Sequence, residues 1–337
     1  MSSAYFDLLG DRFTLHAPGA TLAPYHRPMH WFERPWPRYM TACARAAWLA
    51  VSDRKRIFLT RDIAIALTVV LLGVRAVYEV HSEPAGKLPA AMFRWLAKRS
   101  NFKLVCISRA LFDYYGDRFG IPESRRQVAH SGVFPELYLP LRLLGKTALR
   151  KKLGLPADRL VIVHSGSLYK GGAELFGELA GAHQQALLIH LGGKTEECEA
   201  WAAHYLDRGF SNLRFIPHQP AETVREYQVA ADLLFYVSTK KSPIYWCTSP
   251  LKLFEYMASG TPVLGCRLGS VSEAFDDSLG FCFDPDDPES IRAGFETFLR
   301  EPAAAAERAA NALAAAEQRY SWHRRAEAIL KFADGSF

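Results

Sequence analysis

The sequence predicts an α/β protein of two domains, each an open parallel sheet with helices on its faces. The first observation is length: 337 residues exceed one ordinary domain of about 150. The second is that short apolar runs rich in β-branched residues alternate with helical patterns, which is typical of parallel sheets with crossover helices. The third is a cluster of prolines and glycines at 135–145, where we expect an interdomain linker before the alternation restarts.

In the first half, strands are expected at 56–60, 75–80 and 102–107. Helices are expected at 63–72 and from Ser108 to about residue 119. The apolar run at 63–74 is too short for a membrane span, which needs roughly 20 residues, so a buried helix is expected there. The first residues lack the basic flank and apolar run of a secretory signal.

The second half repeats the alternation more clearly. Strands are expected at 160–164, 185–191, 213–216, 233–237, 262–266 and 280–283. Helices are expected from about 173, at 221–231, at 303–319 and at about 322–332. In open parallel sheets ligands bind beyond the carboxyl ends of the strands, so the site is expected where the two halves face each other.

Composition excludes several classes of protein. Six cysteines are widely spaced without a Cys-x-x-Cys pair, which indicates reduced thiols in a cytosolic protein and disfavours a structural zinc site. Residues 1–150 hold 22 Lys and Arg against 11 Asp and Glu, a net +11, and the remaining 19 and 24 leave −5 for residues 151–337. No aromatic-interleaved basic motif accompanies the basic half, so nucleic-acid binding is disfavoured.

The most informative segment is 248–264, Thr-Ser-Pro-Leu-Lys-Leu-Phe-Glu-Tyr-Met-Ala-Ser-Gly-Thr-Pro-Val-Leu. Local rules predict a helix with Ser249 at the N-cap, Pro250 at its first position and Gly260 at its end. Its amino end has no acidic residue, so the free N–H groups suit a diphosphate. Glu255 lies roughly 7–8 Å further along the axis, about the reach from a diphosphate to a ribose. The same residues also fit a well-capped surface helix with an exposed Lys252–Glu255 pair.

This segment resembles the nucleotide-sugar motif of the retaining glycosyltransferases of family four (glycosyl transferases group 1). Four other stretches match that family in the same order. Residues 163–171 resemble the first strand and loop of its donor domain, which implies that Lys170 binds the diphosphate, and 77–81 resemble the strand whose final histidine, here His81, contacts the transferred sugar. Residues 280–288 and 320–322 resemble its C-terminal pattern, in which a helix crosses back to the N-terminal domain.

The resemblance implies the GT-B fold, two Rossmann-like α/β domains facing each other across a cleft. The implied units are an acceptor domain at 1–140, a donor domain at 141–320 and a returning helix at 321–337. The implied catalytic residues are His81, Lys170 and Glu255. The implied donor-binding residues are Gly166, Ser167, Lys170, Cys247, Thr248, Ser249, Pro250, Leu251, Lys252 and Glu255.

The implied activity is retaining, metal-independent transfer of a hexose from a UDP- or GDP-sugar to a sugar or lipid-linked acceptor hydroxyl, in polysaccharide or glycoconjugate assembly. No cofactor is expected. Asp284, Asp286 and Asp287 resemble a metal motif, but a proline-bounded turn and helix cap is favoured. The basic Arg94, Lys98, Arg99 and Lys103 suit an anionic membrane surface at the cytoplasmic face, or form an ordinary solvated face.

Three departures from the family pattern leave an alternative open. Cys247 stands where the family usually has its first glutamate, eight positions before Glu255, and Ser167 stands where an arginine is common. The first half is also short for an acceptor domain. A non-catalytic GT-B module that binds a nucleotide sugar or a partner is therefore the second hypothesis; a sugar-nucleotide epimerase is less favoured because such enzymes lack the Ser-Pro-Leu-Lys motif.

Overall fold

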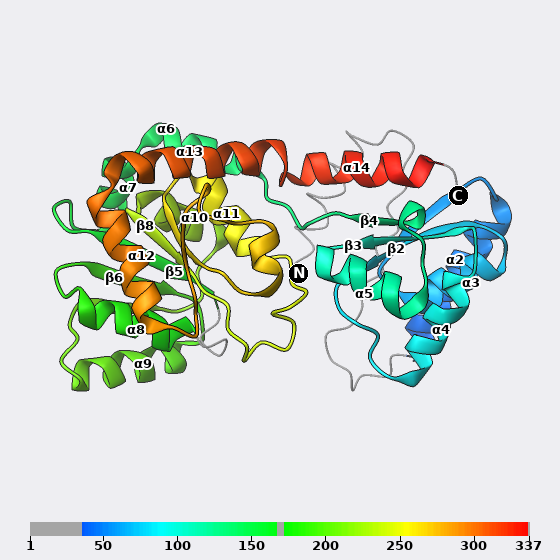
Figure 1. Ribbon diagram of the computed structural model, residues 1–337, viewed down its shortest axis with the longest axis horizontal. Coiled ribbons are helices and arrows are strands. Elements are labelled where there is room, and N and C mark those ends of the chain that lie inside the picture. The colour runs from blue at the N-terminus through cyan, green and yellow to red at the C-terminus, as the bar shows by residue number, and fades with distance from the viewer. Residues whose placement is uncertain (1–35, 167–171, 336–337) are drawn as a thin grey trace.

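The computed structural model describes residues 36–166 and 172–335, which fold around two parallel sheets (Figure 1). The first sheet has four strands in the order β1-β2-β3-β4, and the second has six in the order β10-β9-β8-β5-β6-β7. Every pair of neighbouring strands is parallel. The prediction of two open α/β units is confirmed.

The N-terminal unit contains three of the predicted strands and one more. Its elements are α2 (Trp36–Ser52), β1 (Ile57–Thr60), α3 (Ile63–Leu71), β2 (Arg75–Val80), α4 (Lys87–Ala97), β3 (Phe102–Cys106), α5 (Arg109–Phe119), the 3₁₀ turn η1 (Glu123–Arg125) and β4 (Arg126–Val128). Strand β4 was not expected because its three residues, two of them polar, carry no apolar run. None of the helices in the described part of the chain combines the length and hydrophobicity that a membrane span requires.

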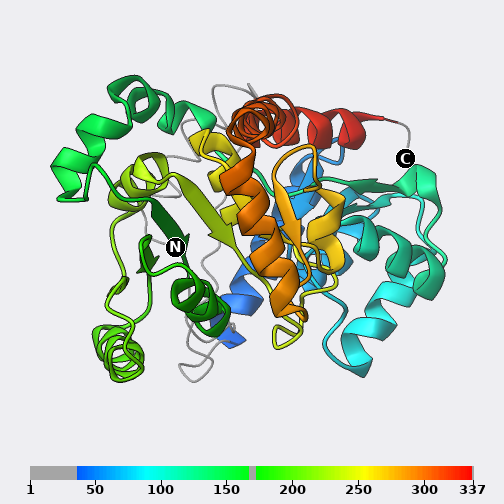
Figure 2. The same cartoon turned by 60° about the vertical axis from the view of Figure 1, so that its left-hand side comes forward.

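The C-terminal unit follows the expected alternation closely. Its elements are η2 (Pro135–Leu137), α6 (Leu139–Leu144), α7 (Lys146–Leu153), β5 (Val161–Ser165), α8 (Gly172–Ala182), β6 (Leu187–Leu191), α9 (Thr195–Asp207), β7 (Leu213–Ile216), α10 (Ala221–Ala230), β8 (Leu233–Tyr236), α11 (Leu251–Ser259), β9 (Val263–Cys266), η4 (Gly269–Glu273), β10 (Phe281–Phe283), α12 (Pro288–Arg300), α13 (Pro302–Gln318) and α14 (Trp322–Asp334). Helices α8 and α12 lie side by side on one face of the sheet (Figure 2).

The segment at 135–145 is helical rather than an extended linker. Pro140 stands at the start of α6, a position where proline favours a helix because its missing N–H needs no partner there. Tyr138 is buried in the core of the C-terminal unit, so this segment belongs to that unit's packing.

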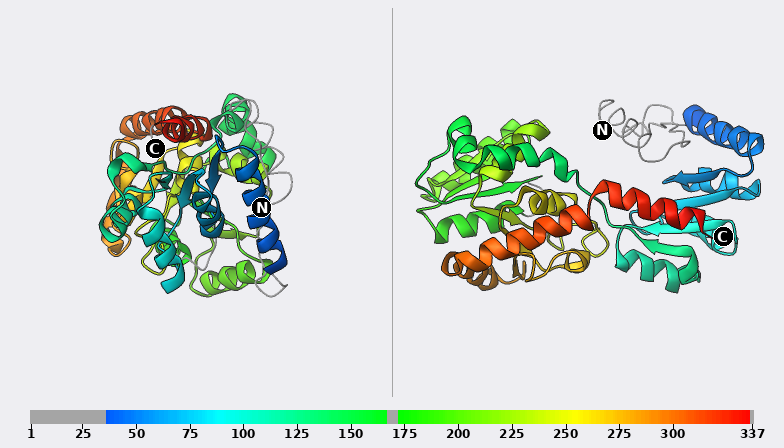
Figure 3. Two further views of the ribbon diagram at one scale, coloured as in Figure 1. Left: turned by 90° about the vertical axis from the view of Figure 1, so that its right-hand side faces the viewer. Right: turned by 90° about the horizontal axis from the view of Figure 1, so that it is seen from above.

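The chain crosses between the units along two adjacent segments, one before η2 and one between α13 and α14 (Figure 3). Val133 N donates to Tyr320 O at 2.8 Å, and Trp322 N donates to Val133 O at 3.0 Å. A Cβ on Gly132 would lie 2.8 Å from Trp322 N, so only glycine allows this approach. The crossing consists of two segments joined by an isolated parallel β-bridge rather than a single tether.

Helix α14 covers one face of the N-terminal sheet (Figure 1). Alternation along the strands places Val77 of β2 and Val105 of β3 on this face, where they pack against Ile329 and Ala333. The opposite face packs against α2 to α5 in a separate core cluster. The expected return of the C-terminal helix to the N-terminal domain is confirmed.

Lys103 lies under α14, and its proposed membrane role is wrong. The side chain is 1% exposed, and its Nζ donates to Phe332 O at 2.6 Å and to Gly335 O at 3.1 Å. Side chains two positions apart in a strand lie on the same face, so Lys103 lies on the face of β3 that Val105 also occupies and that α14 covers. Burial lowers the pKa of this amine, and the carbonyls at the end of α14 supply its acceptors.

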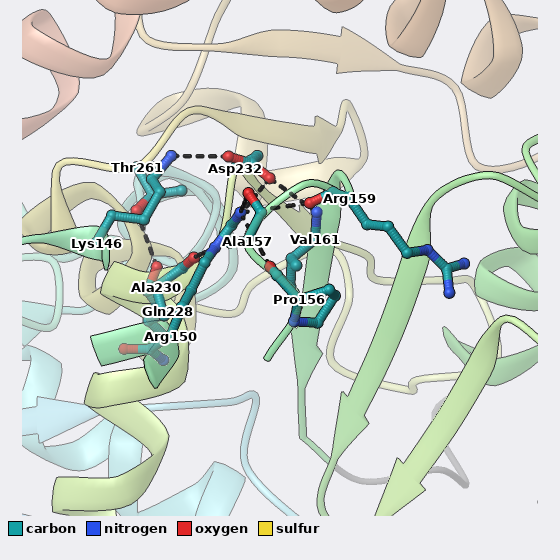
Figure 4. Close-up of polar contacts among 10 residues, drawn as sticks. All are labelled: Lys146, Arg150, Pro156, Ala157, Arg159, Val161, Gln228, Ala230, Asp232 and Thr261. Atoms are coloured by element: carbon teal, nitrogen blue, oxygen red, sulfur yellow. Dashed lines mark hydrogen bonds and ion pairs between the residues drawn. The ribbon is translucent and has the colours of Figure 1, made fainter. Parts of the chain in front are cut away.

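The order of the C-terminal sheet defines its ligand-binding edge. Numbered from β5, the order is 3-2-1-4-5-6, the dinucleotide-fold order in which the chain reverses direction between β5 and β8. At the opposite, amino ends of these strands, Asp232 accepts from Val161 N at 2.8 Å, from Lys146 at 2.9 Å and from the Arg150 guanidinium (Figure 4). Helix α7 is thereby fixed beneath the sheet, away from the binding edge.

Candidate functional site

A pocket of about 330 Å³ lies beyond the carboxyl ends of β5, β6 and β7, at the reversal point of the sheet. Its walls come from the loops after these three strands and from the first turns of α11. The lining residues are Ser165, Gly166, Leu191, Gly192, Gly193, His218, Gln219, Val224, Leu251, Lys252 and Glu255. Four of the residues predicted to bind the donor, Gly166, Leu251, Lys252 and Glu255, therefore meet in one cavity.

The floor of this pocket is backbone. Gly166 N donates to Leu191 O at 2.8 Å, Gly192 N to Ile216 O at 2.9 Å, and His218 N to Gly193 O at 3.0 Å. The backbone hydrogen bonds between neighbouring strands therefore continue beyond the ends of the strands. A Cβ on Gly192 would lie 2.1 Å from Gly166 O. Glycines are therefore required for this close approach, which leaves peptide groups at the floor.

Helix α11 supplies the charged side chains of the pocket. Its first turn carries no acidic residue, and Gly260 ends it at φ 74°, as predicted. Tyr256 anchors the helix to the sheet, since its hydroxyl accepts from Ser165 N at 2.7 Å. The spacing between α11 and the loop after β5 is thus fixed by a buried contact.

The prediction of Ser249 as the N-cap of this helix is wrong. Pro250 occupies the N-cap position, and its side chain can accept no hydrogen bond. Ser249 Oγ instead accepts from Ser131 N of the N-terminal unit at 2.7 Å. The serine therefore joins the two units and leaves the first N–H groups of α11 without a side-chain cap, which retains their capacity for an anion.

Lys252 lies across the glycine at the end of β5. Its Nζ would stand 2.0 Å from a Cβ built on Gly166, which has φ +141°. The two histidines below it, His164 and His190, are buried. Burial, reinforced by the Lys252 charge, lowers the pKa of His190 to about 3 and that of His164 well below its ordinary value. Both rings are neutral at pH 7, so the positive charge here comes from Lys252.

Glu255 stands one turn further along α11 and is partly buried in the pocket wall. Burial raises the pKa of this carboxyl, and Lys252, Gln228 and Arg225 oppose that rise. Helix N–H groups without a side-chain cap, a cation and a carboxylate thus follow one another along one helix. That order suits a ligand with an anionic end and a hydroxyl-bearing end.

Three further predicted donor residues lie outside the pocket lining. Cys247 is fully buried and packs in the core of the N-terminal unit, where its carbonyl accepts from Ser108 Oγ at 3.0 Å. Burial raises the pKa of its thiol to about 11. Thr248 O accepts from Ser270 Oγ at 2.5 Å, and Pro250 is buried behind the helix start. Ser167 and Lys170 lie outside the described residues.

His81 follows β2 and belongs to a three-residue polar chain. Its Nε2 lies 2.6 Å from Glu79 Oε1, and Glu79 Oε2 accepts from Arg325 of α14 at 2.7 Å. Burial alone would raise the pKa of Glu79, but the hydrogen bond from His81 and the Arg325 charge lower it to about 2. An ionised carboxylate only accepts, so His81 Nε2 is the donor of this hydrogen bond.

The acidic cluster after β10 forms a turn and a helix cap, as predicted. Asp287 accepts from Glu289 N at 3.0 Å at the start of α12, and Asp284 accepts from Asp286 N at 2.9 Å. Within the described ranges no group of three or more His, Cys, Asp or Glu side chains is placed to hold a metal ion. All six cysteines are free thiols.

Sequence reasoning missed the wall formed after β6 and β7. Gly192 and Gly193 directly follow a strand, a pattern that marks close backbone approach and could have indicated them. His218, Gln219 and Val224 carried no such signal, because only the sheet order brings the loop after β7 and the start of α10 to the pocket.

The fold and this edge site define a GT-B glycosyltransferase architecture, and solved structures agree. HepE from Anabaena in complex with UDP aligns with TM-score 0.68 at 20% identity over 86% of this chain and 81% of that one. WaaG, a glycosyltransferase involved in lipopolysaccharide biosynthesis, aligns with TM-score 0.67 at 16% identity over 98% and 95% of the two chains. At such identities the likeness shows the fold.

Residues 145–318 match the family described as Glycosyl transferases group 1, and the chain belongs to this family. The D-inositol 3-phosphate glycosyltransferase of Acidothermus cellulolyticus is 29% identical over 230 residues, covering 64% of this chain and 49% of the relative. That of Xylanimonas cellulosilytica is 30% identical over 226 residues, covering 63% and 52%. The chain spans about half the length of the curated relatives it matches.

Proposed function

We propose that this protein transfers a sugar from a nucleoside-diphosphate sugar to an acceptor hydroxyl, with retention of configuration and without a metal ion. The observation that carries the proposal is the pocket at the reversal point of the C-terminal sheet, where Lys252 lies over Gly166 and Glu255 follows on the same helix. Family membership supports the same activity.

In this proposal the carboxylate of Glu255 accepts from the ribose hydroxyls. Lys252, Lys170 and the free N–H groups of α11 bind the diphosphate and stabilise the negative charge that develops on it as the sugar leaves, the main catalytic demand. His81 contacts the transferred sugar. The acceptor hydroxyl attacks from the face that the diphosphate leaves, and a phosphate oxygen takes its proton, so no separate base is required.

Glu255→Ala and Lys170→Ala should each lower the transfer rate at least about 100-fold, which corresponds to roughly 2.7 kcal/mol. Donors are first found by thermal shift with UDP, GDP, UDP-glucose and GDP-mannose, since a ligand at 100 times its Kd adds about 2.7 kcal/mol of stability. Inositol 3-phosphate is included among the acceptors tested, because the curated relatives are D-inositol 3-phosphate glycosyltransferases. Near-normal turnover in either variant would refute the assigned roles.

A non-catalytic nucleotide-sugar-binding module is the second candidate. The buried Cys247 favours it, because no carboxylate stands where the family usually has its first glutamate. Binding of a donor without transfer and without slow hydrolysis, across the donor and acceptor panels, would select this candidate over the enzyme.

We further propose that the protein acts at the cytoplasmic face of a membrane, where it elongates a lipid-linked or polymeric acceptor. Arg94, Lys98 and Arg99 at the end of α4 are exposed and support the proposal, whereas Lys103 takes no part in it. Each basic side chain near an anionic surface contributes about 1 kcal/mol. Charge reversal of the three should abolish sedimentation with phosphatidylserine vesicles, and absence of binding by the unaltered protein would remove the proposal.

A further inference from the structure

The side-chain amide of Gln228 in α10 is buried, and only its oxygen has a hydrogen-bond partner in the described part of the chain. The residue is 0% exposed, and its Oε1 accepts from the hydroxyl of Tyr138, itself 2% exposed, at 2.7 Å. The opposite orientation would turn the amide oxygen toward the carboxylate of Glu255, so the hydroxyl of Tyr138 donates to Oε1. The Nε2 end therefore points away from Tyr138.

The other end of the amide lies against the carboxylate of the pocket. Gln228 Nε2 is buried and makes no hydrogen bond of good geometry with any group of the described chain. The same amide is one of the groups that oppose the rise of the Glu255 pKa caused by burial. A buried N–H donor with no acceptor costs about 1–3 kcal/mol, so its position beside Glu255 needs an explanation.

We propose that Gln228 is a positioning residue for Glu255 and thereby determines recognition of the ribose 2′-hydroxyl; this rests on the proposed binding of a nucleoside diphosphate in the pocket. Nε2 donates to one carboxylate oxygen of Glu255 when the nucleotide is bound. That bond turns the other oxygen toward the ribose hydroxyls. Tyr138 acts one step further back, by holding the amide.

The experiment compares the dissociation constants of UDP with 2′-deoxy-UDP, and of GDP with 2′-deoxy-GDP, by calorimetry on the full chain. Of UDP and GDP, we take the one that the unaltered protein binds more tightly. We expect its dissociation constant to be at least about tenfold lower than that of its 2′-deoxy form, because the deoxy form lacks one hydrogen bond to a charged group. Gln228→Leu should reduce this ratio to below about threefold while the deoxynucleotide affinity stays within about twofold.

Two further variants keep the test decisive. Tyr138→Phe removes one hydroxyl and keeps the aromatic ring in the core, so it should give an intermediate ratio even where Gln228→Leu folds poorly. Thr261→Val is the matched control: it removes the 2.8 Å bond from Thr261 Oγ1 to the Gln228 backbone carbonyl and leaves the amide in place (Figure 4), so the ratio should not change.

The outcomes separate this inference from the function on which it rests. A full ribose preference in Tyr138→Phe and Gln228→Leu, or an equal loss of affinity for ribo- and deoxynucleotides, overturns the role of Gln228. An unaltered protein that binds neither nucleotide overturns the proposed function. A Glu255→Ala variant that retains the ribose preference overturns the assignment of Glu255 itself.

Discussion

At the scale of single residues, the pocket depends on the missing side chain at Gly166. Gly166→Ala would place a methyl group 2.0 Å from Lys252 Nζ and force a residue with φ +141° into a conformation that side chains rarely adopt. We expect nucleoside-diphosphate affinity to fall at least about tenfold, or 1.4 kcal/mol, in calorimetry. Gly154→Ala is the control, because φ is +64° there but no atom lies within 4 Å; a similar affinity loss in both variants would contradict this explanation.

Cys247 cannot simply be exchanged for the family's usual glutamate. Its side chain is 0% exposed among apolar residues of the N-terminal unit, so Cys247→Glu buries a carboxyl without a partner. We expect this variant to lose about 3 kcal/mol of unfolding free energy in urea denaturation, against about 1 kcal/mol for the similarly sized Cys247→Ser. A Cys247→Glu protein as stable as the serine variant, with faster sugar transfer, would show that the loop can turn this position into the pocket.

At the scale of elements, the sequence predicts most of the fold because each strand is a local pattern. The Leu-Leu-Phe-Tyr run of β8 and the Pro-to-Gly bounds of α11 need no tertiary information. Ser249 shows the limit: its type suits an N-cap, yet a backbone N–H from the other unit competes for the same oxygen. Lys103 shows the same limit, because its burial depends on a helix more than 200 residues away.

Docking of α14 includes a titratable contact. The pKa of Glu79 lies at about 2, below its ordinary 4.5, because His81 and Arg325 stabilise the carboxylate despite burial. A carboxyl with a lowered pKa stabilises the fold above pH 4.5, and this contribution, about 3 kcal/mol, is lost as the pH falls from 4.5 to about 2.

Glu79→Gln should therefore be less stable than the unaltered protein at pH 7, and the difference should shrink progressively below pH 4.5. Urea denaturation at pH 7, 5, 4 and 3 measures it, and comparison of the two proteins cancels the other carboxyl groups. Parallel stability curves for the two proteins would mean that Glu79 keeps its ordinary pKa.

At the scale of the whole molecule, the two units have separate large cores and are joined by hydrogen bonds and by smaller apolar contacts: Cys247 packs in the N-terminal core, and α14 packs on the N-terminal sheet. The large apolar clusters are separate, and the loop from Cys247 to Ser249 meets the N-terminal unit through hydrogen bonds to Ser108 and Ser131. Interfaces that combine hydrogen bonds with limited apolar packing are typical of domains that move relative to each other. The sequence does not predict these contacts, because each joins residues more than 100 positions apart.

Glu273 of η4 accepts two hydrogen bonds from the other unit and offers a direct test. Its carboxylate accepts from Arg109 N at 2.5 Å and from Ala110 N at 3.0 Å, so one unit caps the first two N–H groups of α5 in the other. A carboxylate at a helix amino end contributes about 1 kcal/mol. Glu273→Ala should weaken the docking of the two units and increase the radius of gyration in small-angle X-ray scattering, while Glu273→Gln, which keeps an acceptor but loses the charge, should fall between.

Glu289→Ala is the matched control, since it removes an exposed carboxylate of the same unit that pairs with Arg292 one turn away on the same helix. A scattering curve for Glu273→Ala that superposes on that of Glu289→Ala would show that the units stay docked without this cap. In that case the two units are held by the hydrogen bonds between Val133 and Tyr320–Trp322. Gly132→Ala, which places a methyl group against Trp322 N, would then be the substitution that separates the units.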